Sequence, residues 1–205
     1  MMERYGDSPL REECGVFGIF GAVEAAEMTY YGLHSMQHRG QEGCGIVTKD
    51  NDGELCCIKG EGLVHEVFDE SKLSRLSGAM AIGHVRYATT GADVLENVQP
   101  FLFRHGTGDF ALAHNGNLVN YRQLRASLEN TGSLFQTSSD SEILAHLVKK
   151  TQSQKDRPRI CNLIDALQQI EGAFAFLVMT SNRIYACRDN NGLRPLSIGR
   201  LVSGG

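Results

Sequence analysis

Short apolar runs bounded by glycine and polar residues predict most of the β-strands in this chain. GVFGIFG at residues 15–21 has the length and punctuation of a buried strand. Residues 43–60 contain two β-rich runs joined through Asp52-Gly53, which predicts a hairpin. Five further runs of strand type follow along the chain, at residues 79–87, 101–105, 110–115, 172–180 and 183–188.

Helical spacing of apolar residues marks the segments between these strands. Residues 24–37 place Ala26, Tyr30 and Leu33 on one face, and residues 64–76 predict a short helix. Residues 120–130 predict a helix that ends near Gly132. Residues 138–150 open with Ser and Asp at capping positions, and their apolar face is Ile143, Leu144 and Leu147. Residues 159–170 carry a core-facing apolar stripe at positions 160, 163, 164, 167 and 170.

The order of these elements predicts the fold class. Strands come first, then helices, then strands again, and most strand pairs are joined as hairpins. This order favours an α+β fold in which antiparallel sheets pack against outer helices. No linker, low-complexity tract or internal repeat divides the 205 residues, so one domain is expected.

Composition and charge exclude several classes of protein. The chain is 41% hydrophobic and 21% charged, as in ordinary globular proteins, and its net charge of −4 gives no reason to expect nucleic acid or an anionic membrane as partner. No apolar run approaches the roughly 20 residues of a membrane span. The N-terminal residues lack the apolar stretch of a signal peptide. We therefore expect a cytoplasmic protein.

The six cysteines do not form a disulfide or metal pattern. No C-x-x-C pair occurs, and no histidine gives a metal-ligand spacing with a cysteine pair. Cys56 and Cys57 are adjacent on a predicted strand, so they should point to opposite faces. Most of the cysteines are interpreted as small buried hydrophobic residues.

Cys14 differs from the others in its surroundings. The 13 residues before it are polar and unpatterned, and the glycine after it lets a ligand or another backbone come close. A thiol with a reference pKa of about 8.5 needs a base to act as a nucleophile near pH 7. If the chain were cut before Cys14, the new α-amino group, with a pKa of about 7.7–8.0, would supply that base. Residues 1–13 would then be a propeptide, and Cys14 an N-terminal nucleophile.

Five strings in compatible order support this interpretation through a resemblance to a known family. CGVFG at residue 14, HSMQHRGQEGCGI at 34–46, HVRYATTG at 84–91, AHNGNL at 113–118 and SSDSEILAHL at 138–147 resemble the glutaminase half of amidophosphoribosyltransferase. RDNNGLRPLSIG at 188–199 is similar to a late segment of that family. The resemblance implies the N-terminal-nucleophile hydrolase fold, a four-layer αββα sandwich of two antiparallel sheets over residues 14–205.

The resemblance also implies roles for individual residues in the hydrolysis of L-glutamine. Cys14 would attack the amide, and the Asn115 side chain and Gly116 backbone N–H would form the oxyanion hole. Arg86 would bind the substrate carboxylate and Asp140 its ammonium group, with Asp140 also able to cap a helix. Arg39, Tyr87 and Thr89 would be further substrate-binding residues. Arg39 and Gly40 would also shape the glutamine pocket, and Thr89 and Thr90 would bond the substrate or order their loop. His84 and His114 are expected to support the site and not to act as the base.

The resemblance further implies that the chain is the first domain of a longer transferase. A C-terminal phosphoribosyltransferase domain, absent from this chain, would use the ammonia to convert phosphoribosylpyrophosphate to 5-phosphoribosylamine, a glycosyltransferase step that opens purine biosynthesis. Mg and, in members with propeptides, a 4Fe–4S cluster would belong to that C-terminal part, and a homo-oligomer is implied. No cofactor or metal is expected in residues 1–205. Two alternatives stay open: a glutaminase domain serving another acceptor, as in glucosamine-6-phosphate synthase, or a non-catalytic module of the same fold.

Overall fold

Two four-stranded antiparallel sheets form the centre of the computed structural model, which describes residues 14–50, 52–87, 95–106, 108–150 and 158–201. Sheet A has the strand order β1-β4-β2-β3, and sheet B has the order β5-β6-β7-β8. The strands of sheet A are β1 (Gly15–Phe20), β2 (Gly43–Lys49), β3 (Leu55–Glu61) and β4 (Met80–Arg86). Those of sheet B are β5 (Phe101–Phe103), β6 (Phe110–Leu118), β7 (Gly172–Thr180) and β8 (Ile184–Arg188). Each expected strand is confirmed.

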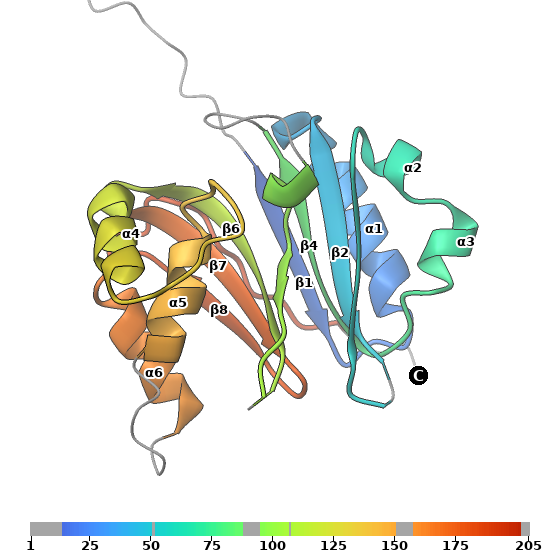
Figure 1. The fold of residues 1–205 in the computed structure, drawn as a ribbon. Helices are drawn as coiled ribbons and strands as arrows, with labels where there is room; N and C mark the ends of the chain where they lie inside the picture. The colour runs from blue at the N-terminus through green and yellow to red at the C-terminus, as the bar shows by residue number, and fades with distance from the viewer. Residues whose placement is uncertain (1–13, 51, 88–94, 107, 151–157, 202–205) are drawn as a thin grey trace, which may run out of the picture.

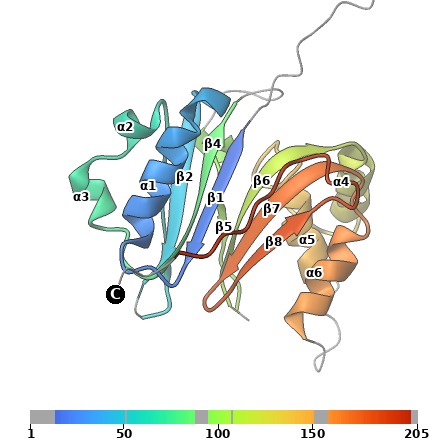
Figure 2. The ribbon, with the colours of Figure 1, turned by 180° about the vertical axis from the view of Figure 1, so that it is seen from behind.

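Helices cover the outer face of each sheet, which gives the four layers that the resemblance implied (Figures 1 and 2). The helices beside sheet A are α1 (Ala25–Ser35), α2 (Val64–Val67) and α3 (Glu70–Leu73). Those beside sheet B are α4 (Tyr121–Asn130), α5 (Glu142–Lys150) and α6 (Arg159–Leu167). Two short 3-10 turns, η1 (Gln37–Arg39) and η2 (Leu95–Asn97), precede β2 and β5. The αββα arrangement is therefore confirmed.

Three apolar clusters separate the layers. One lies between the two sheets and includes Val47 and Ile82 from sheet A with Ala113 and Leu177 from sheet B. The other two lie between each sheet and its helices. Strand alternation sorts the side chains among these clusters. Cys56 packs in the helix-side cluster of sheet A while its neighbour Cys57 packs between the sheets, as expected for adjacent strand residues.

Two details of the predicted helices are wrong. The segment at residues 64–76 forms two one-turn helices and not a single helix, because Phe68 is buried in extended conformation between them and the Asp69 side chain caps α3 by accepting from Lys72 N. In α6, Ile164 is 46% exposed, although the predicted stripe placed it in the core. The core position Leu163 of that stripe is buried as expected.

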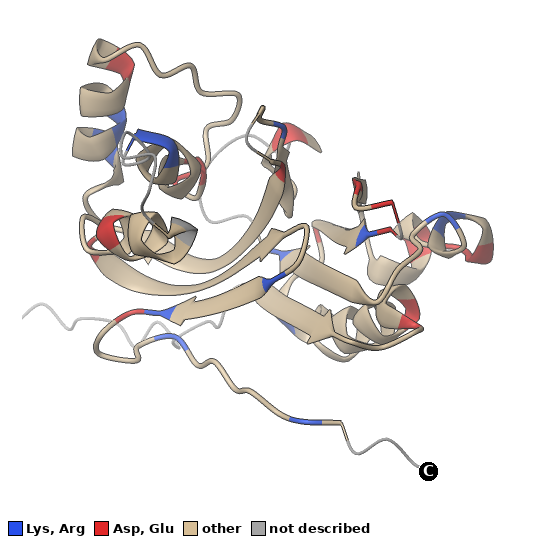
Figure 3. Cartoon of the chain, turned by 90° about the horizontal axis from the view of Figure 1, so that it is seen from below, with Lys and Arg blue, Asp and Glu red and all other residues tan. Residues whose placement is uncertain are grey.

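Charged residues lie mainly on the helices and loops, whereas the two sheets carry few of them (Figure 3). Acidic and basic positions both occur along these outer segments. No described helix has the length and apolar character needed to cross a membrane.

Candidate active site

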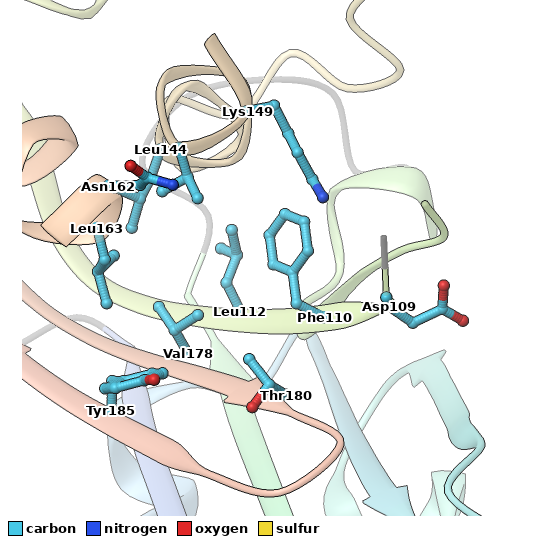
Figure 4. Close-up of a pocket in the computed structure, with 12 residues that line it drawn as sticks. Asp109, Phe110, Leu112, Leu144, Lys149, Asn162, Leu163, Val178, Thr180 and Tyr185 are labelled. Atoms are coloured by element: carbon cyan, nitrogen blue, oxygen red, sulfur yellow. The ribbon is translucent and has the colours of Figure 1, made fainter. Parts of the chain in front are cut away.

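Two hollows of the molecule differ sharply in chemistry. A cavity of about 50 Å³ between sheet B and helices α5 and α6 is lined mostly by apolar side chains such as Phe110, Leu112 and Leu163 (Figure 4). A second cavity, of about 230 Å³, lies where the N-terminus of β1 meets the C-terminal ends of β4 and β6. Its lining is polar and contains the Cys14 thiol. The first is a small gap in packing, and the second has the groups that a reaction needs.

The polar cavity brings together residues that are far apart in the sequence. Its lining is Cys14, His84, Arg86, Tyr87, Asn97, Gln99, His114, Gly116, Asn117, Tyr121, Ser138, Ser139, Asp140 and Ser141. Five of the predicted site residues, Cys14, Arg86, Tyr87, Gly116 and Asp140, are in this set. Thr89 and Thr90 lie outside the described residues, so their predicted roles stay predictions.

Cys14 is held at the entrance of β1 in an unusual backbone conformation. Among the described residues it is the one non-glycine with positive φ, at 63°. Its backbone N–H donates to Arg39 O at 3.0 Å, and its carbonyl accepts from Arg39 Nε at 2.8 Å. The thiol sulfur lies 3.4 Å from Tyr87 N and 3.6 Å from Tyr87 O. The sulfur thus accepts from the Tyr87 backbone N–H, and the thiol donates to the Tyr87 carbonyl oxygen. Non-glycine residues held in such a strained backbone conformation concentrate at functional sites.

The segment QHRG is close to Cys14 because Gly40 has no side chain. A Cβ on Gly40 would lie 2.6 Å from the Arg86 carbonyl carbon, so only glycine lets this segment rest on the end of β4. Arg39 itself does not line the polar cavity formed by the described residues. Its guanidinium contacts the Cys14 backbone, so the structure favours a role in fixing Cys14 over the predicted contact with substrate.

Arg86 and Asp140 supply opposite charges to the cavity. Arg86 ends β4 and is 8% exposed. The Asp140 carboxylate accepts from Leu118 N at 2.8 Å and from the Ser141 hydroxyl at 3.2 Å, so β6 fixes its position. Burial raises the pKa of Asp140, but the close approach of His114 and these two hydrogen bonds outweigh burial and lower the pKa below its ordinary value. Asp140 is therefore ionised at neutral pH, as a partner for a cation must be.

The Asn115-Gly116 pair lies at the C-terminal end of β6. Asn115 is 3% exposed and follows Ala111 and Ala113 on the face of β6 turned toward sheet A. Its Oδ1 is buried without a hydrogen-bond partner among the described residues. Gly116 lines the cavity with φ of 148°, a value that only glycine adopts readily. Both residues therefore belong to strand β6, and Gly116 lines the polar cavity whereas Asn115 is not in its lining.

Several polar residues of the site were not found by sequence reasoning. Asn97, ending η2, exchanges hydrogen bonds with the Ser138 hydroxyl and backbone N–H, at 3.0 and 3.2 Å. Gln99 Nε2 donates to Ser141 Oγ at 3.2 Å. These contacts join the segment before β5 to the segment before α5, some 40 residues later. The SSDS string was the available signal, but its serines were interpreted only as helix caps.

His84 joins the two sheets below the cavity. It is fully buried, and its Nε2 lies 3.1 Å from the backbone oxygen of His114 on β6. Burial lowers the pKa of His84 to about 3, so the ring is neutral at physiological pH. Because Nε2 faces a carbonyl oxygen, that nitrogen carries the proton and Nδ1 is an acceptor.

This buried histidine predicts a loss of stability in mild acid. The unfolded chain binds a proton at His84 below its ordinary pKa of 6.5, and the folded chain does not until about 3. The contribution of His84 to the free energy of unfolding is therefore fully present above about pH 6.5. It falls as the pH drops, by about 2 kcal/mol between pH 7 and 5. His84→Gln, which keeps a donor toward His114, should reduce that loss by about the same amount. Urea unfolding of the wild type and His84→Gln at pH 7 and 5 measures this difference in unfolding free energy.

His65→Gln, at an exposed histidine in α2, is the matched control and should keep the wild-type difference between pH 7 and 5. An identical pH dependence in the wild type and His84→Gln would contradict the assignment.

Comparisons with known proteins identify the family of this chain. The pattern of the family described as "Glutamine amidotransferase domain" matches residues 84–204. The amidophosphoribosyltransferase of Bacillus subtilis is 56% identical over 193 residues, which are 94% of this chain and 40% of that protein. The amidophosphoribosyltransferase of Lacticaseibacillus casei is 48% identical and matches over 93% of this chain and 96% of its own sequence.

Solved structures give the same answer for the fold. Glutamine phosphoribosylpyrophosphate amidotransferase from B. subtilis, complexed with ADP and GMP, superimposes with a TM-score of 0.83 at 54% identity. The alignment covers 92% of this chain and 40% of that one, so the chain spans well under half the length of this relative. Together, the family match, the identities over nearly the whole chain and the shared fold establish the relationship. The chain belongs to the amidophosphoribosyltransferase family and carries its glutamine amidotransferase domain.

Proposed function

We propose that this chain hydrolyses L-glutamine to glutamate and ammonia, with Cys14 as the nucleophile once residues 1–13 have been removed. The observation that carries the proposal is the common cavity of Cys14, Arg86 and Asp140. Glutamine presents a carboxylate, an ammonium group and an amide. A guanidinium, a carboxylate and a thiol are the side chains that bind or react with these three groups.

Removal of residues 1–13 supplies the base and relieves strain. In the uncut chain the Cys14 nitrogen is an amide, which cannot take up a proton. After cleavage it becomes an amine with a pKa of about 7.7–8.0, suited to proton transfer near neutral pH. The φ torsion of 63° is defined by the carbonyl carbon before Cys14, so cleavage of that bond also abolishes the constraint. The propeptide itself lies outside the described residues.

The proposed reaction proceeds through a thioester. The Cys14 sulfur bonds to the amide carbon, and the α-amino group passes the thiol proton to the departing nitrogen, which leaves as ammonia. Water then attacks the thioester, giving glutamate and restoring the thiol. Negative charge on the substrate oxygen in each step would be stabilised by Gly116 N–H and the Asn115 amide, each contributing about 3 kcal/mol by analogy with measured oxyanion holes.

The fate of the ammonia follows from the family. We propose that in the full-length protein a C-terminal domain transfers it to phosphoribosylpyrophosphate, forming 5-phosphoribosylamine at the start of purine biosynthesis. The relatives of 48–56% identity reported above are all named amidophosphoribosyltransferases, which favours this acceptor over a sugar phosphate. A homo-oligomer and a cytoplasmic location stay predictions.

The expected metal groups do not fit the described part of this chain. No three His, Cys, Asp or Glu side chains among the described residues come together as a metal ion requires. That Mg and a 4Fe–4S cluster belong to the C-terminal part stays a prediction, and no step of glutamine hydrolysis is derived through them.

Labelling with a glutamine analogue tests the proposal. A diazoketone in place of the amide should alkylate Cys14 in the full-length protein, and excess glutamine should prevent it. Intact-mass measurement is expected to show loss of residues 1–13 and one adduct, which peptide mapping places on the new N-terminal cysteine. An active sample that retains residue 13, or an adduct on another cysteine, would overturn the proposal.

A further inference from the structure

A chain of buried polar groups leads from Asp140 into sheet B. His114 Nδ1 lies 2.8 Å from Ser141 Oγ, and Ser141 Oγ lies 3.2 Å from Asp140 Oδ1. The direct distance from His114 Nδ1 to Asp140 Oδ1 is longer, at 3.6 Å. His114 and Ser141 are 2% and 1% exposed, so neither exchanges these contacts with bulk water. The serine hydroxyl is therefore the closest link between the imidazole and the carboxylate.

The imidazole of His114 is held by a ring stack and through its backbone. Its ring stacks on Phe176 at 4.1 Å between centroids and 12° between planes. Its backbone N–H donates to Gln99 Oε1 at 2.7 Å, and its backbone oxygen faces His84 Nε2. Because Gln99 Oε1 accepts from this N–H, the other end of the same amide is the nitrogen that donates to Ser141 Oγ. One glutamine thus ties the histidine and the serine together.

This arrangement restricts the serine hydroxyl. Gln99 Nε2 occupies one acceptor position of Ser141 Oγ, and Ser139 Oγ lies 3.1 Å away on another side. A hydroxyl has one proton to donate and two positions that accept. Four polar atoms surround these three positions: Gln99 Nε2, Ser139 Oγ, His114 Nδ1 and Asp140 Oδ1. No position of the Ser141 hydroxyl is therefore left without a partner. Such a satisfied buried network holds its members in one geometry.

We propose that His114 is a positioning residue that acts through Ser141 to hold the Asp140 carboxylate where it receives the α-ammonium group of the substrate. The inference rests on the proposed function, because it assigns a role within the binding of glutamine. The inference gives the two ring nitrogens different roles. Nδ1 positions the Asp140 carboxylate through Ser141, whereas Nε2 has no hydrogen-bond partner among the described residues and is not needed for this task. His114 touches no reacting atom in this scheme.

Two substitutions of His114 distinguish this role from general packing. Asparagine places an amide nitrogen or oxygen at the position of Nδ1 and can still bond Ser141. Glutamine extends its amide toward the position of Nε2 and leaves Ser141 without that partner. Both remove the ring that stacks on Phe176.

In the processed full-length protein, His114→Gln should raise the KM for glutamine about 10- to 100-fold, the size expected when a bond that orients a charged group is lost. Its kcat should stay within about threefold. His114→Asn should keep KM within about threefold.

A variant of Ser141 tests the same contact independently, so the inference stays testable if the histidine variants do not fold. Ser141→Ala removes the linking hydroxyl and should also raise KM about tenfold or more with little change in kcat. In a double-mutant cycle, His114→Gln combined with Asp140→Asn should be no worse in KM than Asp140→Asn alone, because both act on one contact. The rate at which iodoacetamide alkylates Cys14 does not require the carboxylate, and it should be unchanged in the variants.

The outcomes separate the inference from the function on which it rests. Equal KM values for the wild type and His114→Gln, equal effects of the asparagine and glutamine variants, or full additivity with Asp140→Asn would each overturn the positioning role. A wild-type protein that does not hydrolyse glutamine would instead overturn the proposed function.

Discussion

Replacement of Cys14 by alanine is expected to abolish glutamine hydrolysis, with kcat reduced by about 10,000-fold or more. The thioester cannot form without the sulfur, and the remaining groups only bind substrate and stabilise charge. Binding should survive, because Arg86 and Asp140 are held by β4 and by Leu118 of β6 and not by the cysteine. The measurements are ammonia release and, by calorimetry, the Kd for glutamine, both in protein expressed to begin at residue 14.

Serine and a distant cysteine provide the controls for this prediction. Cys14→Ser replaces the thiol by a hydroxyl, a much weaker nucleophile at neutral pH, so its kcat should be close to that of the alanine variant. Cys161→Ala alters a half-buried cysteine in α6, outside the lining of the polar cavity, and should keep wild-type kcat. An alanine variant at position 14 that retains more than a few per cent of the activity would show that another group carries out the chemistry.

The strands and the layered fold were predictable because their signals are local. A strand such as β4 has the apolar run and the length that mark a buried strand in any context. The same is true of the hairpin of β2 and β3, whose register follows from the two runs and their turn. The break between α2 and α3 was missed because it depends on the burial of Phe68, a tertiary contact that overrides helical spacing.

Some residues of the candidate site were predictable from the sequence, but the contacts between them were not. Cys14, Arg86 and Asp140 were identified from strings that resemble a family, and the structure places them in one cavity. Apart from the adjacent Ser141, the hydrogen-bond partners that hold Cys14 and Asp140 are 22 to 73 positions away in the chain, and nothing in local composition signals such contacts. Arg39 is the clearest case: its segment was recognised, but its bond to the Cys14 carbonyl became evident only from the fold.

Gly116→Ala is expected to lower kcat for glutamine about 100- to 1,000-fold while KM changes little. At φ of 148° a Cβ on this residue would overlap the Ala173 carbonyl oxygen and lie 2.8 Å from Phe174 Cα, both on the neighbouring strand β7. The backbone must therefore move, and the Gly116 N–H moves with it. A donor displaced from the developing oxyanion costs transition-state stabilisation of about 3–4 kcal/mol, whereas Arg86 and Asp140 still hold the ground state. Steady-state kinetics on the processed protein measures the split between kcat and KM.

Gly132→Ala separates the loss of the oxyanion donor from backbone strain alone. Gly132 also has positive φ, at 94°, but a Cβ there would meet no atom within 4 Å, and the residue follows α4, outside the lining of the polar cavity. This variant should lose stability through the same kind of conformational strain and keep its kcat. If both variants lost activity in proportion to their unfolding free energies, the effect at position 116 would be one of folding. A loss of kcat confined to Gly116→Ala, in protein that stays folded at the assay temperature, is the result that an oxyanion donor at this residue requires.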